Sequence, residues 1–538
     1  MKNVSPFHRL KELLKLDKSI ITKLYLYAIF SGIVSLSLPL GIQSVIYYIQ
    51  AGQITTSWIV LIFLVIGGVV LSGALQIMQL RITETLQQRI YVRYSFDFAY
   101  RFPRINRQRL KGRNPSELMN RFFDVISLQK GISKVLLELF SAFLLIVFSL
   151  TVLCFYHPFF ILFSIVLVAI VFIVFRPIMR RGIDTSLAES KHKYKTAFWL
   201  QEIARGDWSF RLASKGNHSL ERLDRHAGDY LCSRESHFKV LWTQYLWMIA
   251  LKSLAVAALL GLGGYLVINQ QMNLGQFVAA EILILLILGG VEKIIQLLET
   301  VYDVFTSLEK LGQVQDLPLV FDHAETDFPA DDIFPVHLME NRGENAVEVL
   351  EIQQAKHQII TGIGEHLSGL MLRCLVDTTV SDRFTPHWNN TLPSAQMMAD
   401  AFDDFGWYTP LAYVFEGTVM DNVILGRASI GGKELVKALE TVGMANRVRS
   451  LTPGNASPMN KEVFDTCEIQ RLLLARAIVH APALLIASFY GSALDETEQE
   501  KLLQNISSNY PGTTIICAAA KPFQNLKWKV TDLSEKLN

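Results

Sequence analysis

Long apolar runs alternate with polar connections over the first 300 residues of the chain. A helix needs about 20 apolar residues to cross a bilayer, because hydrocarbon offers its backbone no other hydrogen-bond partners. Six segments reach or approach this length, namely residues 24–49, 58–80, 135–156, 159–175, 245–268 and 277–299. The fourth is short, but the Phe-Tyr-His-Pro turn at 155–158 leaves little room outside the membrane. The pattern predicts six spans, with the third and fourth forming a helical hairpin.

Basic residues are concentrated in two of the connections. Residues 81–130 hold 11 Lys and Arg and residues 176–239 hold 13, whereas residues 50–57 and 269–276 hold none. Positive loops stay on the cytoplasmic side of a membrane. An even number of spans then places both termini in the cytoplasm. The basic loops lack Pro and Gly clusters apart from 104–115, which favours long helices that continue beyond the bilayer over separate small domains.

The pattern changes after residue 316. Residues 317–345 are acidic and contain several prolines, as is typical of a linker. Short β-type runs at 358–361, 483–486 and 513–517 then alternate with helical stretches near 370–376 and 468–480. This alternation predicts an α/β domain with a mainly parallel sheet over 346–538. Residues 1–316 form the predicted membrane domain.

Composition agrees with a membrane protein. The chain has 538 residues, of which 51% are hydrophobic and only 19% charged. Its net charge of +2 gives no sign of a nucleic-acid partner. Five cysteines are scattered without CxxC spacing, so neither a disulfide framework nor a metal site is predicted.

The stretch after 357–361 has the outline of a phosphate-binding loop without its chemistry. Such a loop needs a glycine-rich turn after a strand, a Lys for the phosphate oxygens and a Ser or Thr for magnesium. Counted from Gly362, Ser368 takes the place of the Lys and Gly369 that of the Ser. Gly364 lies within the turn, and Glu365 replaces the second motif glycine with a carboxylate that repels phosphate.

Residues 470–495 (QRLLLARAIVHAPALLIASFYGSALD) carry a family resemblance. They resemble the ATP-binding-cassette (ABC) family from its signature helix through the Walker B strand to the D-loop. The resemblance aligns Glu468 with the last signature position, Ser488 with the Walker B aspartate and Phe489 with the catalytic glutamate. The D-loop is kept through Asp495.

Two further segments resemble the same family. Residues 408–422 resemble its Q-loop region, with Pro410 in place of the glutamine, and residues 513–521 place Ala519 where the switch histidine belongs. The resemblance thus implies a nucleotide-binding domain that has lost its chemically active side chains. We expect neither ATP nor magnesium as a cofactor, and no hydrolysis by this domain. The alternative is an ordinary α/β domain misaligned to the family.

The membrane half resembles ABC exporters as well. Residues 112–121, with Glu117 and Arg121, resemble the first coupling region of the family. Residues 197–205, with Glu202, resemble the second, and 273–280 the start of span six. The expected fold is therefore a six-span ABC type I exporter transmembrane domain followed by an α/β nucleotide-binding-domain-like unit. By overall pattern it is most similar to peptide, toxin and protein exporters of type I secretion.

Ionisable residues inside spans are candidates for a transport pathway. Glu281 lies near the outer end of span six, and Glu292 lies deeper, beside Lys293. Each could instead reach an interface, as could Lys252 in span five. We name Glu281 and Glu292 as candidate pathway residues.

Two functions follow from the resemblance. The chain is either a transport subunit of an exporter, driven by a partner, or a non-transporting scaffold or regulator of a secretion or transport complex. Intact spans favour the first. The expected location is the bacterial inner membrane, with both termini cytoplasmic. The expected partners are a second copy or another ABC exporter half, with a membrane-fusion adaptor also among the partners of this type.

Overall fold

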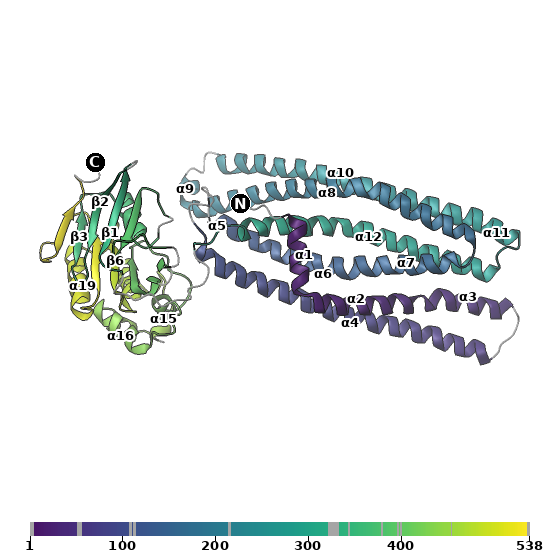
Figure 1. Cartoon of the computed structure of the whole chain (residues 1–538), viewed down its shortest axis with the longest axis horizontal. Coiled ribbons are helices and arrows are strands. Elements are labelled where there is room, and N and C mark those ends of the chain that lie inside the picture. The colour runs from purple at the N-terminus through teal and green to yellow at the C-terminus, as the bar shows by residue number, and fades with distance from the viewer. Residues whose placement is uncertain are drawn as a thin grey trace. The chain divides into compact units, whose positions relative to one another are not determined.

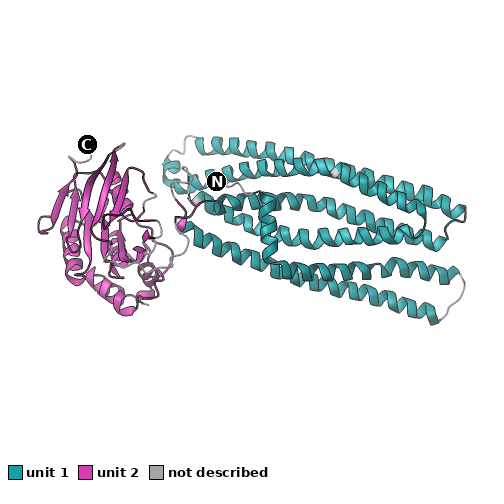
Figure 2. Ribbon diagram, in the orientation of Figure 1, with its two compact units in different colours: residues 1–103, 112–317 teal, residues 104–111, 318–538 magenta. Residues whose placement is uncertain are grey.

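The computed structural model describes residues 5–50, 56–106, 110, 115–212, 217–320, 333–342, 345–377, 380–394, 397–398, 401–452 and 454–534. The chain divides into two compact units, shown in Figure 2. The first comprises residues 1–103 and 112–317, and the second residues 104–111 and 318–538.

The first unit is all helical (Figure 1). Its α-helices are α1 (Pro6–Leu16), α2 (Lys18–Ser35), α3 (Ser37–Gln50), α4 (Thr56–Arg101), α5 (Pro115–Met119), α6 (Asp124–Lys134), α7 (Phe140–Cys154), α8 (Pro158–Arg205), α9 (Asp207–Leu212), α10 (His218–Ala258), α11 (Gly264–Ile268) and α12 (Leu274–Gln315). Within the described residues, six helical stretches are long and apolar enough to cross a membrane. The six-span prediction is confirmed at this level.

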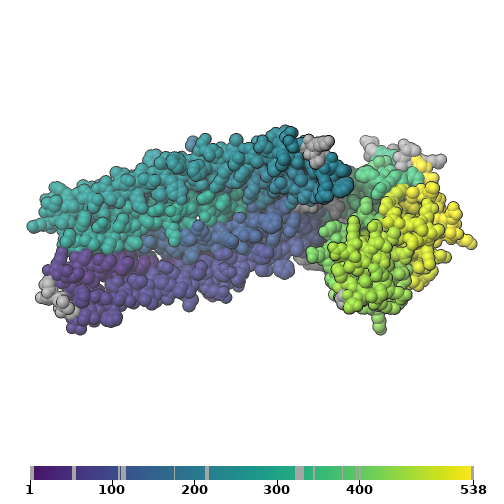
Figure 3. All heavy atoms as spheres, turned by 180° about the vertical axis from the view of Figure 1, so that it is seen from behind, coloured from purple at the N-terminus to yellow at the C-terminus, as the bar shows by residue number. Residues whose placement is uncertain are grey.

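Several helices are much longer than a bilayer requires. Helix α4 has 46 residues, α8 has 48 and α10 has 41. At about 1.5 Å per residue they reach roughly 60–70 Å, about twice the thickness of the hydrocarbon core. The spans therefore continue as helices beyond the apolar segments, as predicted. Within this unit α2 and α4 lie along one side and α8 and α10 along the other, in both Figure 1 and Figure 3.

Local signals set two of the helix starts. Helix α7 ends at Cys154 and α8 begins at Pro158, where the His157 ring accepts a hydrogen bond from the Phe159 amide at 3.1 Å. This tight connection is the predicted hairpin. Helix α12 begins with a reciprocal cap, in which the Asn273 side chain accepts from the Gln276 amide at 2.7 Å.

The two coupling regions differ in outcome. Residues 112–114 of the first lie outside the described residues, and its remainder forms α5 and a 3-10 turn at Asn120–Phe123. The second, 197–205, forms the end of α8. Nothing in it breaks a helix before Gly206, whose amide caps α8 on the Glu202 carbonyl at 3.0 Å. The short helix α9 follows instead.

The second unit contains two sheets. Strands β5 (Phe405–Tyr408), β6 (Leu484–Ser488), β7 (Thr514–Ala518), β3 (Gln358–Thr361) and β8 (Lys529–Asp532) form a five-stranded sheet in that spatial order. All of its pairings are parallel. Strands β2 (Asn345–Ile352), β1 (Val336–Arg342) and β4 (Phe384–Trp388) form an antiparallel sheet. The predicted α/β fold with a mainly parallel sheet is confirmed.

Strand residues on both faces of the parallel sheet pack into hydrophobic cores, to which the helices of this unit contribute. These helices are α13 (Glu365–Cys374), α15 (Val419–Ile424), α16 (Gly432–Thr441), α17 (Ala445–Arg449), α18 (Thr466–Ile478) and α19 (Glu496–Asn509). Successive strand residues join opposite cores: Ile359 and Leu485 pack into one, Ile360 and Leu484 into the other. This double burial is why the strands read as continuous apolar runs.

The predicted linker requires a correction. Strand β1 falls inside residues 317–345 and is the central strand of the antiparallel sheet. Val336 and Leu338 are fully buried, so the alternation of buried and half-buried residues makes this segment a strand despite the prolines before it. Residues 321–332 lie outside the described residues. Strands β6 and β7 each begin one residue later than predicted.

Close packing of α8 on α12 gives a stability prediction. A Cβ added to Gly182 would overlap the ring of Tyr302, which is fully buried, whereas a Cβ on Gly228 of α10 meets nothing within 4 Å. We expect Gly182→Ala to destabilise the first unit by about 1–3 kcal/mol through overpacking. Gly228→Ala should be neutral or stabilising by up to about 1 kcal/mol. Thermal unfolding in detergent measures both, and equal midpoints would contradict the packing.

Candidate functional site

The predicted phosphate-binding turn lies between β3 and α13. Gly362 has a φ of +79°, a conformation that favours glycine, and a Cβ there would overlap the Asp532 carboxylate. Gly364 precedes α13 as its N-cap and offers no side chain to the helix. The strand, turn and helix of a phosphate-binding loop are therefore in place.

The side chains on this framework differ from those that bind phosphate. Ser368 is 1% exposed, and its hydroxyl donates to the Glu365 carbonyl at 2.9 Å, back into its own helix. Gly369 and Glu365 line a cavity of about 560 Å³ beside α13. A Cβ on Gly491 would lie 3.8 Å from Glu365 Oε1, which places this carboxylate against the loop that follows β6.

The lining of this cavity differs from that of a phosphate-binding loop. Its described lining residues are Glu365, His366, Gly369, Leu370, Arg373, Trp407, Thr409, Leu411, Ser488 and Tyr490. None of these described residues is a lysine, and Glu365 places a negative charge at the turn, which opposes phosphate. Arg373 and the hydroxyls of Thr409 and Ser488 line the same cavity.

The residue that directly follows β6 packs in the hydrophobic core. Phe489 is 5% exposed, and its ring centroid lies 5.2 Å from that of Tyr408 and 6.1 Å from that of Phe523. The amide of Phe489 donates to the Ala518 carbonyl at 2.9 Å. An aromatic ring in the core has no group to accept a proton from water. This position cannot supply a general base.

Tyr490 is a residue that sequence reasoning missed. Its hydroxyl lies 2.5 Å from the Ile363 carbonyl and 3.1 Å from the Ala519 carbonyl. It therefore joins the phosphate-binding turn to the position that the switch histidine would hold. Burial raises the pKa of Tyr490, so it remains a protonated donor at neutral pH. The sequence gives no signal for this role, because Ile363 and Ala519 are distant from Tyr490 along the chain.

The start of α18 is closed by its own side chains. The Asp465 carboxylate accepts from the Glu468 amide at 2.8 Å, and the Glu468 carboxylate accepts from the Asp465 amide at 3.1 Å. Arg447 Nε lies 2.9 Å from Glu468 Oε1. A helix N-terminus attracts anions through its free amides and its dipole. Two carboxylates already occupy that role here.

Asp495 keeps a structural role. It is the N-cap of α19, where its side chain accepts from the Thr497 hydroxyl at 2.6 Å and from the Glu498 amide at 2.7 Å. These hydrogen bonds, led by that from Thr497, hold the pKa of Asp495 below its usual value. The D-loop before it is fixed by Gln470, which accepts from the Ser492 hydroxyl and the Ala493 amide, each at 2.9 Å.

The structure brings together some predicted site residues and separates others. Glu365, Gly369 and Ser488 share one cavity. Pro410 lies in a second cavity of about 780 Å³, formed by the Q-loop segment, the start of α18 and the D-loop. Ala519 is buried, where its carbonyl accepts from the Tyr490 hydroxyl and its amide donates to the Ile360 carbonyl, each at 3.1 Å.

Most of the predicted residues of the first unit take part in ion pairs. Glu117 lies 3.6 Å from Arg121, and Glu202 lies 3.2 Å from Arg205. Glu292 on α12 lies 3.3 Å from Lys252 on α10.

Lys293 and Glu281 are the other ionisable residues noted in span six. Lys293 lies 3.8 Å from Glu138, across to the turn between α6 and α7. Glu281 is half-buried and belongs to neither of these pairs.

Curated proteins similar in sequence are ABC transporter proteins. The chain is 21% identical over 432 residues to the lactococcin-A transport/processing ATP-binding protein of Lactococcus lactis, covering 77% of this chain and 58% of that protein. It is 21% identical to the leukotoxin translocation ATP-binding protein of Mannheimia glucosida, covering 64% and 49%. The cyclolysin secretion/processing ATP-binding protein of Bordetella pertussis is 22% identical, with 64% and 50% covered. The chain thus spans about half to three fifths of these relatives. No protein-family model matches it.

Among solved structures, a bacterial Atm1-family ABC exporter with ATP bound is similar over almost the whole chain. The TM-score is 0.75 at 14% identity, covering 96% of this chain and 94% of that one. The fold is that of an ABC exporter. The chain is therefore similar in sequence to ABC transporter proteins, and its six long apolar helices support a multi-pass membrane protein.

Loss of the Tyr490 hydroxyl should loosen the phosphate-binding turn. Tyr490→Phe leaves two inward-facing carbonyls without their donor, which costs about 1–3 kcal/mol. We expect faster amide hydrogen exchange at residues 362–366 and a lower unfolding midpoint. Tyr413→Phe is the matched control, because Tyr413 is 82% exposed. Identical exchange in the two variants would contradict the bridging role.

Proposed function

We propose that this chain is a transport subunit of an ABC-type exporter, and that its own nucleotide-binding unit does not hydrolyse ATP. One observation carries the proposal. The position of the catalytic base holds Phe489, which is buried in the core of an otherwise complete nucleotide-binding fold. The first unit, called the membrane unit from here on, has in contrast six long apolar helices with paired charges.

The rate lost when a catalytic group is removed supports the proposed loss of ATP hydrolysis. Removing one preorganised group that stabilises a transition state typically costs a factor of 10² to 10³ in rate. Here the lysine, the magnesium hydroxyl, the Walker B aspartate and the base are replaced by Ser368, Gly369, Ser488 and Phe489. Such losses compound, so hydrolysis falls to the uncatalysed level. ATP and magnesium are not cofactors of this unit in our proposal.

Association with a second nucleotide-binding unit does not restore a complete ATP site. In ABC proteins each ATP is held between the Walker motifs of one unit and the signature of the other. In a homodimer of this chain both would be replaced. With a competent exporter half, one composite site lacks its Walker side and the other meets the start of α18, where Asp465 and Glu468 cap each other. The proposed partner is a heterologous exporter half, with a membrane-fusion adaptor as a further one.

Charge in the connections supports the proposed orientation. Residues 81–130 and 176–239 carry the basic excess, which places them in the cytoplasm together with both termini. The second unit then lies on the cytoplasmic face of the bacterial inner membrane.

The second candidate function is a scaffold or regulator without transport. The closed start of α18 favours it. The carboxylates of Asp465 and Glu468 already accept hydrogen bonds from amides at this helix start, so no nucleotide phosphate is needed there. The two candidates differ in whether export depends on this chain.

Nucleotide binding by the purified full chain tests the loss of the ATP site. Calorimetric titration with ATP and magnesium should show no saturable binding up to millimolar concentration, because Glu365 replaces a glycine and none of the described residues that line the cavity is a lysine. A curated exporter relative in the same detergent serves as the positive control. A micromolar dissociation constant for this chain would overturn the proposal.

Export by a reconstituted complex separates the two functions. An exporter half that co-purifies with the chain is placed in proteoliposomes with and without it. A transport subunit predicts that export of the partner's substrate is lost without this chain. Phe489→Leu in this chain, which keeps an apolar side chain in the core, should leave ATP hydrolysis by the complex unchanged. Equal export in the two preparations would contradict a transport role and favour the scaffold.

A further inference from the structure

Helix α1 runs across the long helices of the membrane unit and not along them (Figure 1). Both of its ends are fastened to other helices. At its C-terminal end, Asp17 is 3% exposed, and its carboxylate accepts from Arg93 of α4 at 2.9 Å. In its first turns, Arg9 forms an ion pair with Asp316, the residue that caps the end of α12. Helix α1 therefore connects the end of α12 to α4.

The pair of Arg9 and Asp316 is largely shielded from water. The two side chains are 11% and 18% exposed. Gly312, one turn before Asp316, lets the guanidinium lie close to α12, because a Cβ there would be 2.5 Å from Arg9 Cζ. Solvent and salt screen an exposed ion pair strongly and a shielded one much less. This pair therefore holds α1 on α12 more firmly than an exposed pair would.

Apolar packing under α1 is incomplete. A cavity of about 380 Å³ lies between α1, α4 and α12, and Arg9, Leu13, Arg93, Asp97 and Gln315 are among its lining residues. Within residues 6–16, which the structure describes in full, Leu13 is the one buried residue. Hydrophobic stabilisation is roughly proportional to the apolar area that is buried, so one leucine contributes little. Ion pairs therefore decide whether α1 stays in place.

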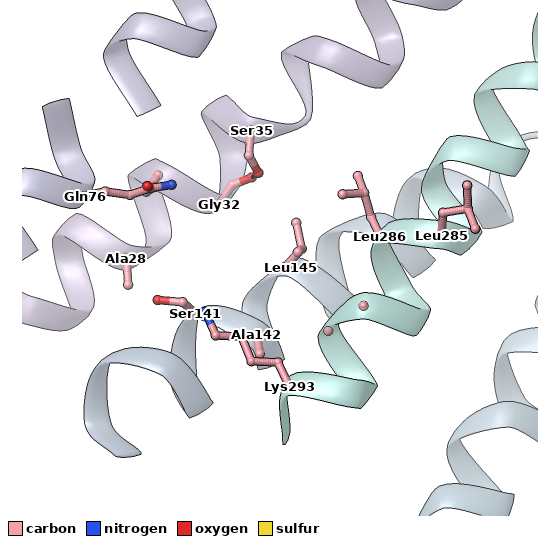
Figure 4. Close-up of a pocket in the computed structure, with 13 residues that line it drawn as sticks. Ala28, Gly32, Ser35, Gln76, Ser141, Ala142, Leu145, Leu285, Leu286 and Lys293 are labelled. Carbon is pink, nitrogen blue, oxygen red and sulfur yellow. Dashed lines mark hydrogen bonds between the residues drawn. The ribbon is translucent and has the colours of Figure 1, made fainter. Parts of the chain in front are cut away.

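Polar contacts also join the end of α12 directly to the end of α4. Arg101 Nη1 donates to the Gln315 carbonyl at 2.9 Å, and Gln315 Nε2 donates to Asp97 Oδ2 at 3.0 Å. Farther along the helices, a cavity of about 290 Å³ lies between Gly32 of α2 and Lys293 of α12 (Figure 4). The helix ends therefore supply contacts that are interrupted at this cavity.

The two connections that follow α4 and α12 pair with each other within the second unit. The amide of Asn106, which follows α4, donates to the carbonyl of Pro318, which follows α12, at 3.0 Å. The Val320 amide donates to the Arg104 carbonyl at 2.7 Å. These hydrogen bonds are those of a short antiparallel bridge. A shift of one connection is therefore passed to the other.

We propose that α1 is a strap that fixes the ends of α4 and α12 to each other, and that the pair of Arg9 and Asp316 closes it. With the strap closed, a movement of the second unit displaces α4 and α12 together. With the pair broken, the end of α12 moves independently of α4, and less of that movement reaches the spans. The inference rests on the proposed transport function and deepens it, because it names how a subunit without ATP hydrolysis of its own follows its partner.

Amide hydrogen exchange in the purified full chain tests the strap itself. Arg9→Gln removes the charge that pairs with α12. We expect the amides of Asn106 and Val320 to exchange about tenfold faster, because losing a shielded hydrogen bond to a charged group favours local opening. Lys11→Gln is the matched control, because Lys11 is exposed on the same helix and its charge is in no ion pair among the described residues. Equal exchange in the two variants overturns the proposal.

Two further changes reach the pair from α12. Gly312→Ala places a Cβ against the Arg9 guanidinium and should also speed exchange, whereas Gly289→Ala of the same helix should not, because a Cβ there meets nothing within 4 Å. Asp316→Arg should act as Arg9→Gln does, and adding Arg9→Asp to it should restore exchange to within about twofold of the unaltered chain. A double variant that exchanges as fast as Asp316→Arg alone contradicts the pair.

Export per ATP hydrolysed, measured in proteoliposomes with the partner half, tests what the strap does. We expect Arg9→Gln to lower this ratio about threefold or more, with the unfolding midpoint unchanged and Lys11→Gln equal to the unaltered chain. Faster exchange together with an unchanged ratio contradicts the proposed strap and leaves the transport role standing. Export that is equal without this chain contradicts the transport role, and with it the part of the strap in transport.

Discussion

The membrane unit depends on one constraint: hydrocarbon gives backbone amides and carbonyls no partners, so each span must satisfy its own. Continuous helices are the result, and α4, α8 and α10 extend this solution well beyond the bilayer. The same constraint governs side chains. Lys252 is paired with Glu292 and Lys293 with Glu138, so adjacent residues of α12 meet opposite charges on two different neighbours. All four side chains remain partly exposed, so each pair adds little to the stability of the unit.

In the second unit, the residues at the positions that the family resemblance assigns to ATP chemistry make interactions within the fold. Phe489 packs between two aromatic rings, Ser368 bonds back to its own helix and Asp495 caps the next one. Tyr490 ties the phosphate-binding turn to the buried Ala519. Each substitution is therefore matched by a local interaction. A domain maintained in this way can keep its contacts with partners while giving up nucleotide chemistry, which is the basis of the proposed transport subunit.

The sequence predicted what periodicity and local chemistry determine. The six spans, the turn before Pro158 and the bounds of β3 follow from apolar length, a turn signal or a strand signal, whereas the start of α12 near Asn273 was indicated by the family resemblance. Strand β1 was assigned to a linker, because the prolines near it outweighed an alternation of only a few residues. The roles of Tyr490 and Arg9 could not be found in the sequence. Their significance comes from neighbours that are distant along the chain, such as Ile363 and Asp316.

Photolabelling of the assembled exporter with an azido-ATP analogue tests the central claim most directly. The complex of this chain with its partner half is trapped with vanadate during turnover, irradiated, and the labelled polypeptide is identified by mass spectrometry. We predict that label at the Walker motifs is found on the partner half alone. Label on this chain within residues 362–373, at a level similar to that on the partner, would contradict the account.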